Sequence, residues 1–286
     1  MDKPTISRRS LLFLAGAALS QGIEILPAQS AQKIITTKRG AFNKIPFYRT
    51  KIDLKDPNTF LAIGLANNPT LGNHKGIVGD EDFKEMVKRY HAAAIVNGTY
   101  FGTKNPSRVL GNIISGGKIL QRNSLQNWGT TLAIDADNKP NIITARVDGV
   151  PNWDKYWLSL TAGPRLLRKG KIWLAPRSEG FTDPRVMGVA PRVAIGFPAS
   201  GNPLIIVTFL KSVSLWDEAK IMRAIGCSEA LNLDGGSSRA LYNRGKILVT
   251  PKRKLTNVIV AYDAKSPAPQ FLKNAWQKFR ENSFGF

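Results

Sequence analysis

The sequence has 286 residues, of which 43% are hydrophobic and 21% charged, and its formal net charge is +21. This composition is typical of a globular protein with a sizeable core, and it argues against a disordered chain. Cys227 is the only cysteine, which excludes an internal disulfide. We interpret it as a small buried side chain and not as a nucleophile.

The first 30 residues have the layout of an export signal. Arg8 and Arg9 precede an apolar run over residues 11–19, and small residues follow. The stretch "SRRSLLF" is similar to a twin-arginine signal, with an ordinary Sec signal as the alternative. The apolar run is too short to span a bilayer. We therefore expect an exported protein, in the periplasm, the extracellular space or an equivalent lumen. After signal cleavage it would have one domain over residues 31–286 and no stable membrane span.

The positive charge belongs almost entirely to the part that follows this signal. Residues 31–286 keep a net charge of +20, because the first 30 residues contain three basic and two acidic side chains. Such a charge attracts polyanions, which outside the cytoplasm are anionic glycans, phosphate-bearing wall polymers or lipid head groups. None of the common nucleic-acid-binding motifs occurs, so nucleic acid is not expected as a partner.

The first half of the domain alternates strands with one helix. Short apolar runs over residues 34–63 predict strands, and the Gly/Asn-rich segment 67–79 predicts a loop. A helix begins at Asp80, in "DEDFKEMVKRYHA", with acids in its first turn and bases in its last. "AAAIVNGTYFG" then predicts a buried strand that runs into a turn. Further on, "DADNKPN" and "RKGK" mark turns between strands, and residues 175–187 predict a Pro/Gly-rich loop.

The second half continues with a hairpin made of "APRVAIGF" and "PLIIVTFL". A helix begins at Ser214, which forms a capping-box-like pair with Asp217, and ends at Gly226. After "LNLDGGSS" we expect a hairpin over residues 240–262, around "RGK" and "PKRK", and an amphipathic helix over residues 269–282. We assign its apolar stripe to core packing, with binding to a membrane surface as the alternative. Hairpins outnumber helical crossovers, which predicts an α+β fold: a single domain with a mostly antiparallel mixed sheet flanked by a few helices.

Few residues are suited to catalysis. His74 and His91 are the only histidines, and neither a G-x-S-x-G nor an H-E-x-x-H motif occurs. These absences argue against a serine hydrolase and a catalytic zinc site. In "LNLDGGSS", Asp234 ends an apolar strand, and the two glycines after it allow a ligand to approach the backbone. A capped tight turn explains the same residues equally well.

An earlier strand ends in a similar way. "AAIVNGTYF" also follows a predicted helix, and it too brings an asparagine and a glycine to a turn. Two such turns lying side by side at one sheet edge would form a site.

The same segments carry a resemblance to a known family. "LNLDGGSS" resembles the signature of the phosphodiester glycosidases, and "AAIVNGTYF", "TAGPRLL", "PRVAIGF" and "KLTNVIVAY" are similar to further segments of that family in the same order. The resemblance covers roughly residues 34–262. Thr99 replaces the second glycine of the family's first motif, and two glycines follow Asp234 where many members have three. Both departures lie in the expected wall of the pocket, so they affect which substrate is bound more than which reaction is catalysed.

The resemblance implies an exported hydrolase that cleaves a sugar-1-phosphodiester of cell-wall or extracellular polysaccharide, between the anomeric carbon and the phosphate oxygen. It implies a catalytic role for Asp234 near the anomeric carbon and for Arg192 on the phosphate. The substrate contacts that we expect are Asn97, Gly98, Tyr100, Arg165, Asn232, Gly235, Gly236, Ser237 and Ser238. The choice of a second carboxylate is left open between Glu179, Asp183 and Glu229. No cofactor is expected, and no metal site is assigned.

Two alternatives stay open at this point. The first is a non-catalytic protein that binds an anionic glycan in the family's pocket. The second is a phosphodiesterase in which Asp234 binds Mg²⁺ or Ca²⁺ and the P–O bond is cut instead of the C–O bond. In all three interpretations the partner is an anionic glycan or a sugar phosphate.

Overall fold

The computed structural model describes residues 34–68, 79–102, 104, 107–121 and 128–284. The predicted export signal, His74 and most of the loop predicted over residues 67–79 lie outside these ranges. The architecture below is that of the compact unit from Gln32 to Phe286. In the described part of the chain, no helix has the length and apolar character required to cross a bilayer.

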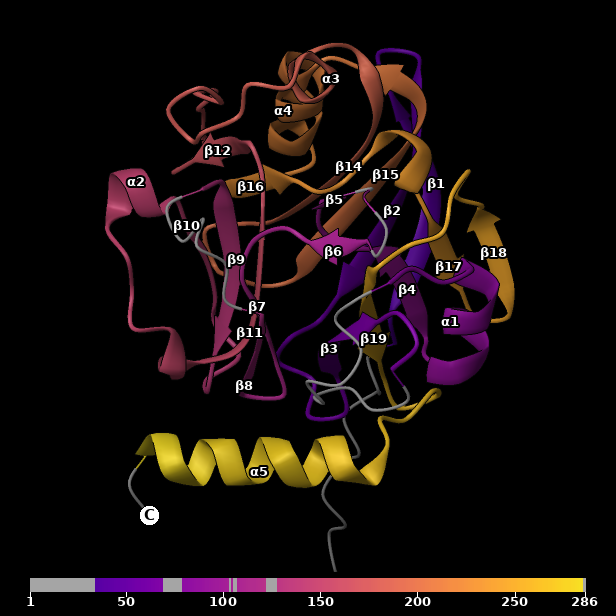
Figure 1. Ribbon diagram of the computed structural model, residues 1–286, viewed down its shortest axis with the longest axis vertical. Helices are drawn as coiled ribbons and strands as arrows, with labels where there is room; N and C mark the ends of the chain where they lie inside the picture. Colours follow the sequence, from indigo (N-terminus) through magenta and orange to yellow (C-terminus); the bar gives the residue numbers. More distant parts are fainter. Residues whose placement is uncertain (1–33, 69–78, 103, 105–106, 122–127, 285–286) are drawn as a thin grey trace, which may run out of the picture. The chain divides into compact units, whose positions relative to one another are not determined.

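The largest sheet has seven strands and carries the segment that leads to Asp234 (Figure 1). In sheet order its strands are β1 (Thr36–Phe42), β2 (Ile45–Ile52), β15 (Leu204–Val213), β14 (Ala190–Phe197), β16 (Glu229–Asn232), β12 (Arg165–Arg168) and β13 (Lys171–Ile172). Helix α4 (Leu215–Ala224) packs on one face of this sheet. As predicted, Ser214 caps the helix by accepting a hydrogen bond from the backbone N–H of Asp217 at 3.1 Å.

Two five-stranded sheets and one short pair complete the β structure of the described residues. One sheet has the order β10 (Pro140–Ile143), β9 (Thr130–Asp135), β11 (Tyr156–Ala162), β7 (Ile113–Ser115) and β8 (Lys118–Gln121). The other has the order β18 (Lys246–Val249), β17 (Leu241–Asn243), β4 (Ala94–Asn97), β19 (Asn257–Tyr262) and β3 (Phe60–Leu65). The short pair is β5 (Phe101–Gly102) with β6 (Arg108–Val109).

The other helices are short, apart from the last. They are α1 (Phe83–Tyr90), α2 (Ala145–Asp148), α3 (Pro184–Met187), α5 (Gln270–Phe284) and the 3₁₀ turns η1 (Trp153–Lys155) and η2 (Gly236–Ser238). The apolar stripe of α5 packs on the core, as predicted, with the ring of Trp276 4.9 Å from that of Trp157 and Leu272 fully buried. Figure 1 shows α5 lying across one end of the sheets.

The predicted α+β class and the antiparallel pairing are confirmed, and the strands are distributed over several sheets. One hairpin differs from the prediction over residues 240–262. β17 and β18 pair around "RGK", but β19 leaves them and lies between β3 and β4. All six residues of β19 are buried, so its backbone N–H and C=O groups need partners within the protein. The position between β3 and β4 supplies these hydrogen bonds on both sides of the strand.

Candidate active site

The two strand ends that the sequence places in similar turns meet in the structure, although they belong to different sheets. β4 ends at Asn97, and its side-chain Nδ2 donates a hydrogen bond to the backbone oxygen of Asp234 at 2.6 Å. In return, the backbone N–H of Asp234 donates to the oxygen of Gly98 at 3.1 Å. Asp234 is therefore fixed at a junction between the seven-stranded sheet and the sheet of β4.

The carboxylate of Asp234 is 6% exposed and has a defined set of partners. Its Oδ1 accepts from the N–H of Gly235 at 2.9 Å, and its Oδ2 accepts from Nη2 of Arg253 at 3.0 Å. Burial raises the pKa of Asp234, while hydrogen bonds from Ser238 and Arg253 act in the opposite direction. The site thus holds a desolvated carboxylate beside a cation, an arrangement suited to charge that develops during a reaction.

Arg253 is a site residue that the sequence analysis missed. Its Nε donates to the Ser238 hydroxyl at 2.6 Å, and its guanidinium lies 4.1 Å from the ring centre of Phe101. The side chain is 31% exposed, so it is the cation beside Asp234 that a solute can reach. The only sequence signal was the basic run "PKRK", which was interpreted as a turn.

The turn after Asp234 combines two crowded residues with two open ones. A Cβ on Gly235 would lie 2.4 Å from the backbone oxygen of Pro191, so close packing requires glycine there. Gly236 has φ +57° and nothing within 4 Å of its missing Cβ. Gly236 and Ser237 are exposed, whereas Ser238 is fully buried under Arg253. The exposed pair borders the buried carboxylate.

Asn97 and Gly98 form the facing turn. Besides its bond to Asp234, Asn97 accepts a hydrogen bond from the N–H of Ala240 at 3.0 Å through Oδ1. A Cβ on Gly98 would lie 2.0 Å from Oδ1 of Asn257. Both residues thus hold the two turns together in addition to any contact with a ligand.

Asn232 and Tyr100 extend the cluster away from Asp234. Nδ2 of Asn232 donates to the Tyr100 hydroxyl at 2.6 Å, and that hydroxyl donates to the oxygen of Gly163 at 2.8 Å. The Tyr100 ring packs against Trp128 and Phe181, with ring centres 5.8 and 5.9 Å away. Burial, and then the charge of Asp234, raise the pKa of Tyr100 well above its usual value, so the phenol stays protonated.

Arg192 lies behind Asn232 and is 3% exposed. Its Nη1 donates to Oδ1 of Asn232 at 3.3 Å, and its other nitrogens donate to the backbone oxygens of Val186, Gly188 and Val213. Glu218, on α4, places Oε2 3.6 Å from Nε of Arg192. Glu218 is fully buried, and burial raises its pKa to about 8 against the effect of Arg192. The sequence analysis did not single out Glu218.

Arg165 is placed in a different ion-pair network. Its Nη1 lies 3.0 Å from Asp148 and its Nη2 lies 2.8 Å from Glu229, and its side chain is 5% exposed. Two carboxylates therefore occupy the guanidinium, and one of them, Glu229, is a candidate for the second carboxylate.

The other two candidates differ in position. Asp183 caps α3 and pairs with Arg185 on the surface. Glu179 is fully buried, accepts hydrogen bonds from the N–H of Arg165 and the Thr130 hydroxyl, and lies against Gly163. Burial raises its pKa to about 7. Glu179 thus shares a neighbour, Gly163, with Asn232 and Tyr100, which both donate hydrogen bonds to the Gly163 oxygen.

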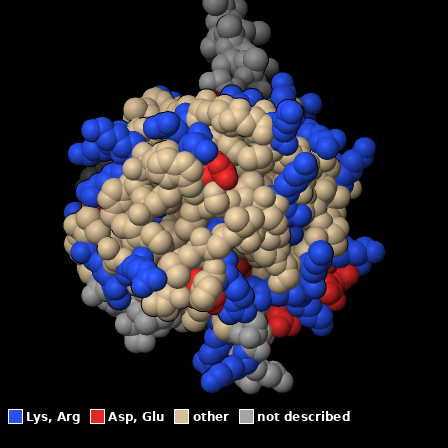
Figure 2. Space-filling view, turned by 90° about the horizontal axis from the view of Figure 1, so that it is seen from above, with Lys and Arg blue, Asp and Glu red and all other residues tan. Residues whose placement is uncertain are grey.

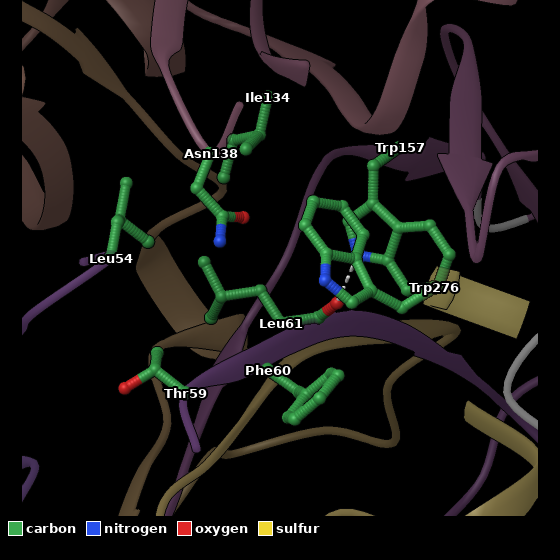
Figure 3. Close-up of a pocket in the computed structure, with 8 residues that line it drawn as sticks. All are labelled: Leu54, Thr59, Phe60, Leu61, Ile134, Asn138, Trp157 and Trp276. Atoms are coloured by element: carbon green, nitrogen blue, oxygen red, sulfur yellow. Dashed lines mark hydrogen bonds between the residues drawn. The ribbon is translucent and has the colours of Figure 1, made fainter. Parts of the chain in front are cut away.

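A small cavity lies elsewhere in the fold (Figure 3). Trp157 and Trp276 bound it on one side, and Leu54, Thr59 and Asn138 line other parts of its wall. Its volume of about 10 Å³ holds at most one water molecule. No predicted site residue lines it. Among the described residues, no three His, Cys, Asp or Glu side chains gather as a metal site.

Solved structures of other proteins share this fold at low sequence identity. The catalytic domain of zebrafish N-acetylglucosamine-1-phosphodiester alpha-N-acetylglucosaminidase, auto-inhibited by its pro-peptide, is 21% identical with a TM-score of 0.60, over 80% of this chain and 82% of that one. A hypothetical protein from Synechocystis is 17% identical with a TM-score of 0.59, over 79% and 61%. A Burkholderia pseudomallei protein named "putative exported protein" is 16% identical with a TM-score of 0.54, over 78% and 75%.

The amino-acid sequence was compared with curated proteins and with family models. No curated protein matches the chain. Residues 90–262 match the phosphodiester glycosidase family, and this segment contains Asn97, Asp234 and Arg253. The match covers more than half of the 286 residues. The chain belongs to the phosphodiester glycosidase family.

Proposed function

We propose that the protein hydrolyses a sugar-1-phosphodiester by breaking the bond between the anomeric carbon and the phosphate oxygen. The observation that carries this proposal is the pair formed by the buried Asp234 carboxylate and the partly exposed Arg253, 3.0 Å apart at an open turn. The family supports a phosphodiester substrate, and the pair supplies the two charges that such a reaction needs.

In this mechanism Asp234 acts at the anomeric carbon, as nucleophile, base or stabiliser of the oxocarbenium-like transition state. The leaving group is a phosphate monoester, which is a weak base, so strong protonation by a general acid is not required. The sequence resemblance implies a role for Arg192 at the phosphate. Its burial and its backbone partners favour Arg253 for the direct contact, with Arg192 holding Asn232 in position.

The remaining contacts follow from the geometry around Asp234. Asn97, Asn232 and Tyr100 are polar groups for sugar hydroxyls. Gly235, Gly236, Ser237 and Ser238 supply a turn against which the substrate lies, and Gly98 allows the facing turn to approach. The ion pairs of Arg165 with Asp148 and Glu229 favour a structural role for that residue.

The test is hydrolysis of soluble sugar-1-phosphodiesters in ¹⁸O-labelled water, with and without EDTA. N-acetylglucosamine-1-phosphodiesters are the first substrates to try, given the name of the zebrafish enzyme. The mass of the released phosphomonoester is the readout, because phosphate oxygens do not exchange with water under these conditions. Unlabelled phosphomonoester, with equal rates in both buffers, is the expected result.

Other outcomes separate the alternatives. Labelled phosphomonoester, lost on adding EDTA, would establish a metal-assisted phosphodiesterase that cuts the P–O bond. Binding of the substrates without turnover, in wild type as well as in Asp234→Asn, would establish a glycan-binding protein.

We further propose that the protein is exported and acts on wall or extracellular polysaccharide. The twin-arginine-like stretch around Arg8 and Arg9 supports export. Replacing both arginines by lysine should retain the precursor inside the cell, as seen by immunoblotting of cell fractions. Normal export of this double variant would contradict the twin-arginine assignment and favour a Sec signal.

A further inference from the structure

The β1–β2 hairpin concentrates positive charge away from the candidate active site. Residues 31–52 contain six Lys and Arg residues and no Asp or Glu. Basic side chains are spread over the surface in Figure 2, so total charge alone does not locate a binding surface. The hairpin lies before residue 90, outside the segment that matches the family, and is thus a feature to be explained separately.

The strand register brings three of these side chains together. Lys38 on β1 lies directly opposite Arg49 on β2, and Arg49 lies opposite Val207 on β15. Lys51 follows two residues after Arg49. Opposed residues, and residues two apart on a strand, point to the same face of a sheet. Lys38, Arg49 and Lys51 therefore share one face, which we call the basic face.

Fold stability does not account for the basic face. Like charges directly opposite each other destabilise an antiparallel pair. A lysine on an edge strand protects against aggregation, which explains Lys38 on β1. It does not explain Arg49 and Lys51, because β2 lies between β1 and β15. No ion pair within the described residues joins any of the three to a carboxylate.

The basic face and the candidate active site belong to the same sheet and are linked by strand register. Val207 lies opposite Ala194, and Ala194 lies opposite Asn232, two residues before Asp234. Three strand spacings separate Arg49 from Asn232, a distance of about 14 Å. Along β2, side chains on one face recur about every 6.7 Å. Val207 and Ala194 are fully buried and belong to the core cluster that includes α4, so a polymer that reached both places would pass over the residues that cover this row. A linear polymer with regularly repeated phosphates can match the spacing along β2.

We propose that Lys38, Arg49 and Lys51 bind a phosphate-bearing glycan chain and hold it while one of its ends occupies the Asp234 site. Lys38 and Lys51 are exposed, and Arg49 is half-buried beside the buried Val207. A half-buried arginine can pack its apolar stem and still present its charged end to a ligand. The identity of this polymer rests on the proposed function, whereas binding of a polyanion by the basic face does not require catalysis.

The test compares two triple variants of the full chain that remove the same charge. One is Lys38→Gln with Arg49→Gln and Lys51→Gln. The control is Lys118→Gln with Lys171→Gln and Lys246→Gln, three exposed lysines on β8, β13 and β18. Binding of end-labelled long-chain inorganic polyphosphate is measured by fluorescence anisotropy at several NaCl concentrations, with circular dichroism to confirm folding.

We expect the basic-face variant to raise the Kd for polyphosphate at least tenfold and the control to raise it less than threefold. The slope of log Kd against log salt should fall by about 2 in the basic-face variant, since each lost phosphate contact contributes about 0.7. Equal effects of the two triples would overturn the proposal, because net charge alone would then explain binding. Tighter binding of oligothymidylate than of polyphosphate at equal charge would overturn it in favour of a nucleic-acid surface.

Two readouts keep this proposal apart from the proposed function. Asp234→Asn should bind polyphosphate like wild type, and the basic-face variant should hydrolyse a small soluble sugar-1-phosphodiester at the wild-type rate. A chain that hydrolyses nothing but loses polyphosphate binding only in the basic-face variant would retain the docking surface and refute the proposed reaction. If the protein hydrolyses the small substrate and the basic-face variant binds polyphosphate like wild type, the proposed reaction is retained and the docking surface is refuted.

Discussion

Replacing Asp234 by asparagine tests the candidate active site most directly. Asparagine keeps the shape of the side chain, and its Oδ1 can still accept from the N–H of Gly235, 2.9 Å away in wild type. The negative charge near the anomeric carbon is lost, and the amide turns a donor toward Arg253. If the carboxylate is catalytic, we expect kcat to fall at least 100-fold, which corresponds to about 2.7 kcal/mol of transition-state stabilisation.

The effect on stability should be small. Because burial raises the pKa of Asp234, the unfolded state releases this proton at a lower pH than the folded state does. The carboxyl group therefore favours folding at low pH, and this contribution is lost as the pH rises through the folded pKa. At neutral pH an ionised, buried Asp234 lowers the free energy of unfolding, and the uncharged asparagine does not have this destabilising effect. The pairing with Arg253, which is 31% exposed, is worth only about 0.2–1 kcal/mol.

The assay measures kcat with a soluble sugar-1-phosphodiester and Tm at pH 7 by calorimetry. We expect a large loss of kcat with a Tm within about 4 °C of wild type. Asp183→Asn is the matched control, since it makes the same change at a carboxylate on the surface, and it should leave kcat unchanged. A folded Asp234→Asn variant with wild-type kcat would refute the catalytic role and leave Asp234 as a turn cap, which asparagine replaces well.

Three further predictions follow from the site. Arg253→Lys should raise KM or lower kcat/KM about tenfold through loss of the guanidinium fork, whereas Arg192→Lys should lower Tm as well, because Arg192 is buried with four hydrogen-bond partners; steady-state kinetics with calorimetry separates the two. Gly98→Ala should destabilise the fold strongly, since its Cβ would lie 2.0 Å from a side-chain oxygen, while Gly236→Ala should cost only about 1–2 kcal/mol for a positive φ in open space; equal losses in urea unfolding would contradict this. Glu179 should make the fold less stable as the pH rises from its unfolded value near 4.5 to about 7, so Glu179→Gln should flatten the fall of Tm over this range, and an unchanged profile would show that Glu179 is not protonated there.

Local signals in the sequence predicted most elements of the fold. The turns "DADNKPN" and "RGK" lie between strands that pair as expected, because a hairpin depends on residues close in the chain. The long-range pairing of β19 with β3 is not encoded locally: their partners Asn257 and Leu65 are almost 200 positions apart. Likewise, the buried character of β4 and β16 was readable, but their membership of two different sheets was not.

In the candidate site, too, residues adjacent in the sequence were predicted and partners distant in the sequence were not. Asp234 was predicted because a strand, an acid and two glycines are adjacent in the sequence. Arg253 was missed, since nothing in a basic turn indicates that its guanidinium reaches a carboxylate 19 residues earlier. The hydrogen bond between Asn232 and Tyr100 joins residues 132 positions apart. Such partners become visible only when the packing of the sheets is known.

The position of Asp234 between two sheets makes its backbone amide a reporter of their relative motion. That amide is held by the oxygen of Gly98, a residue of the other turn, and by no strand partner of its own sheet. If the sheets separate briefly without unfolding, this proton exchanges with solvent while protons inside β16 stay protected. Exchange at Asp234, compared with exchange at Leu231, would therefore give the free energy of opening the junction. A ligand that bridges both turns should slow the first and leave the second unchanged.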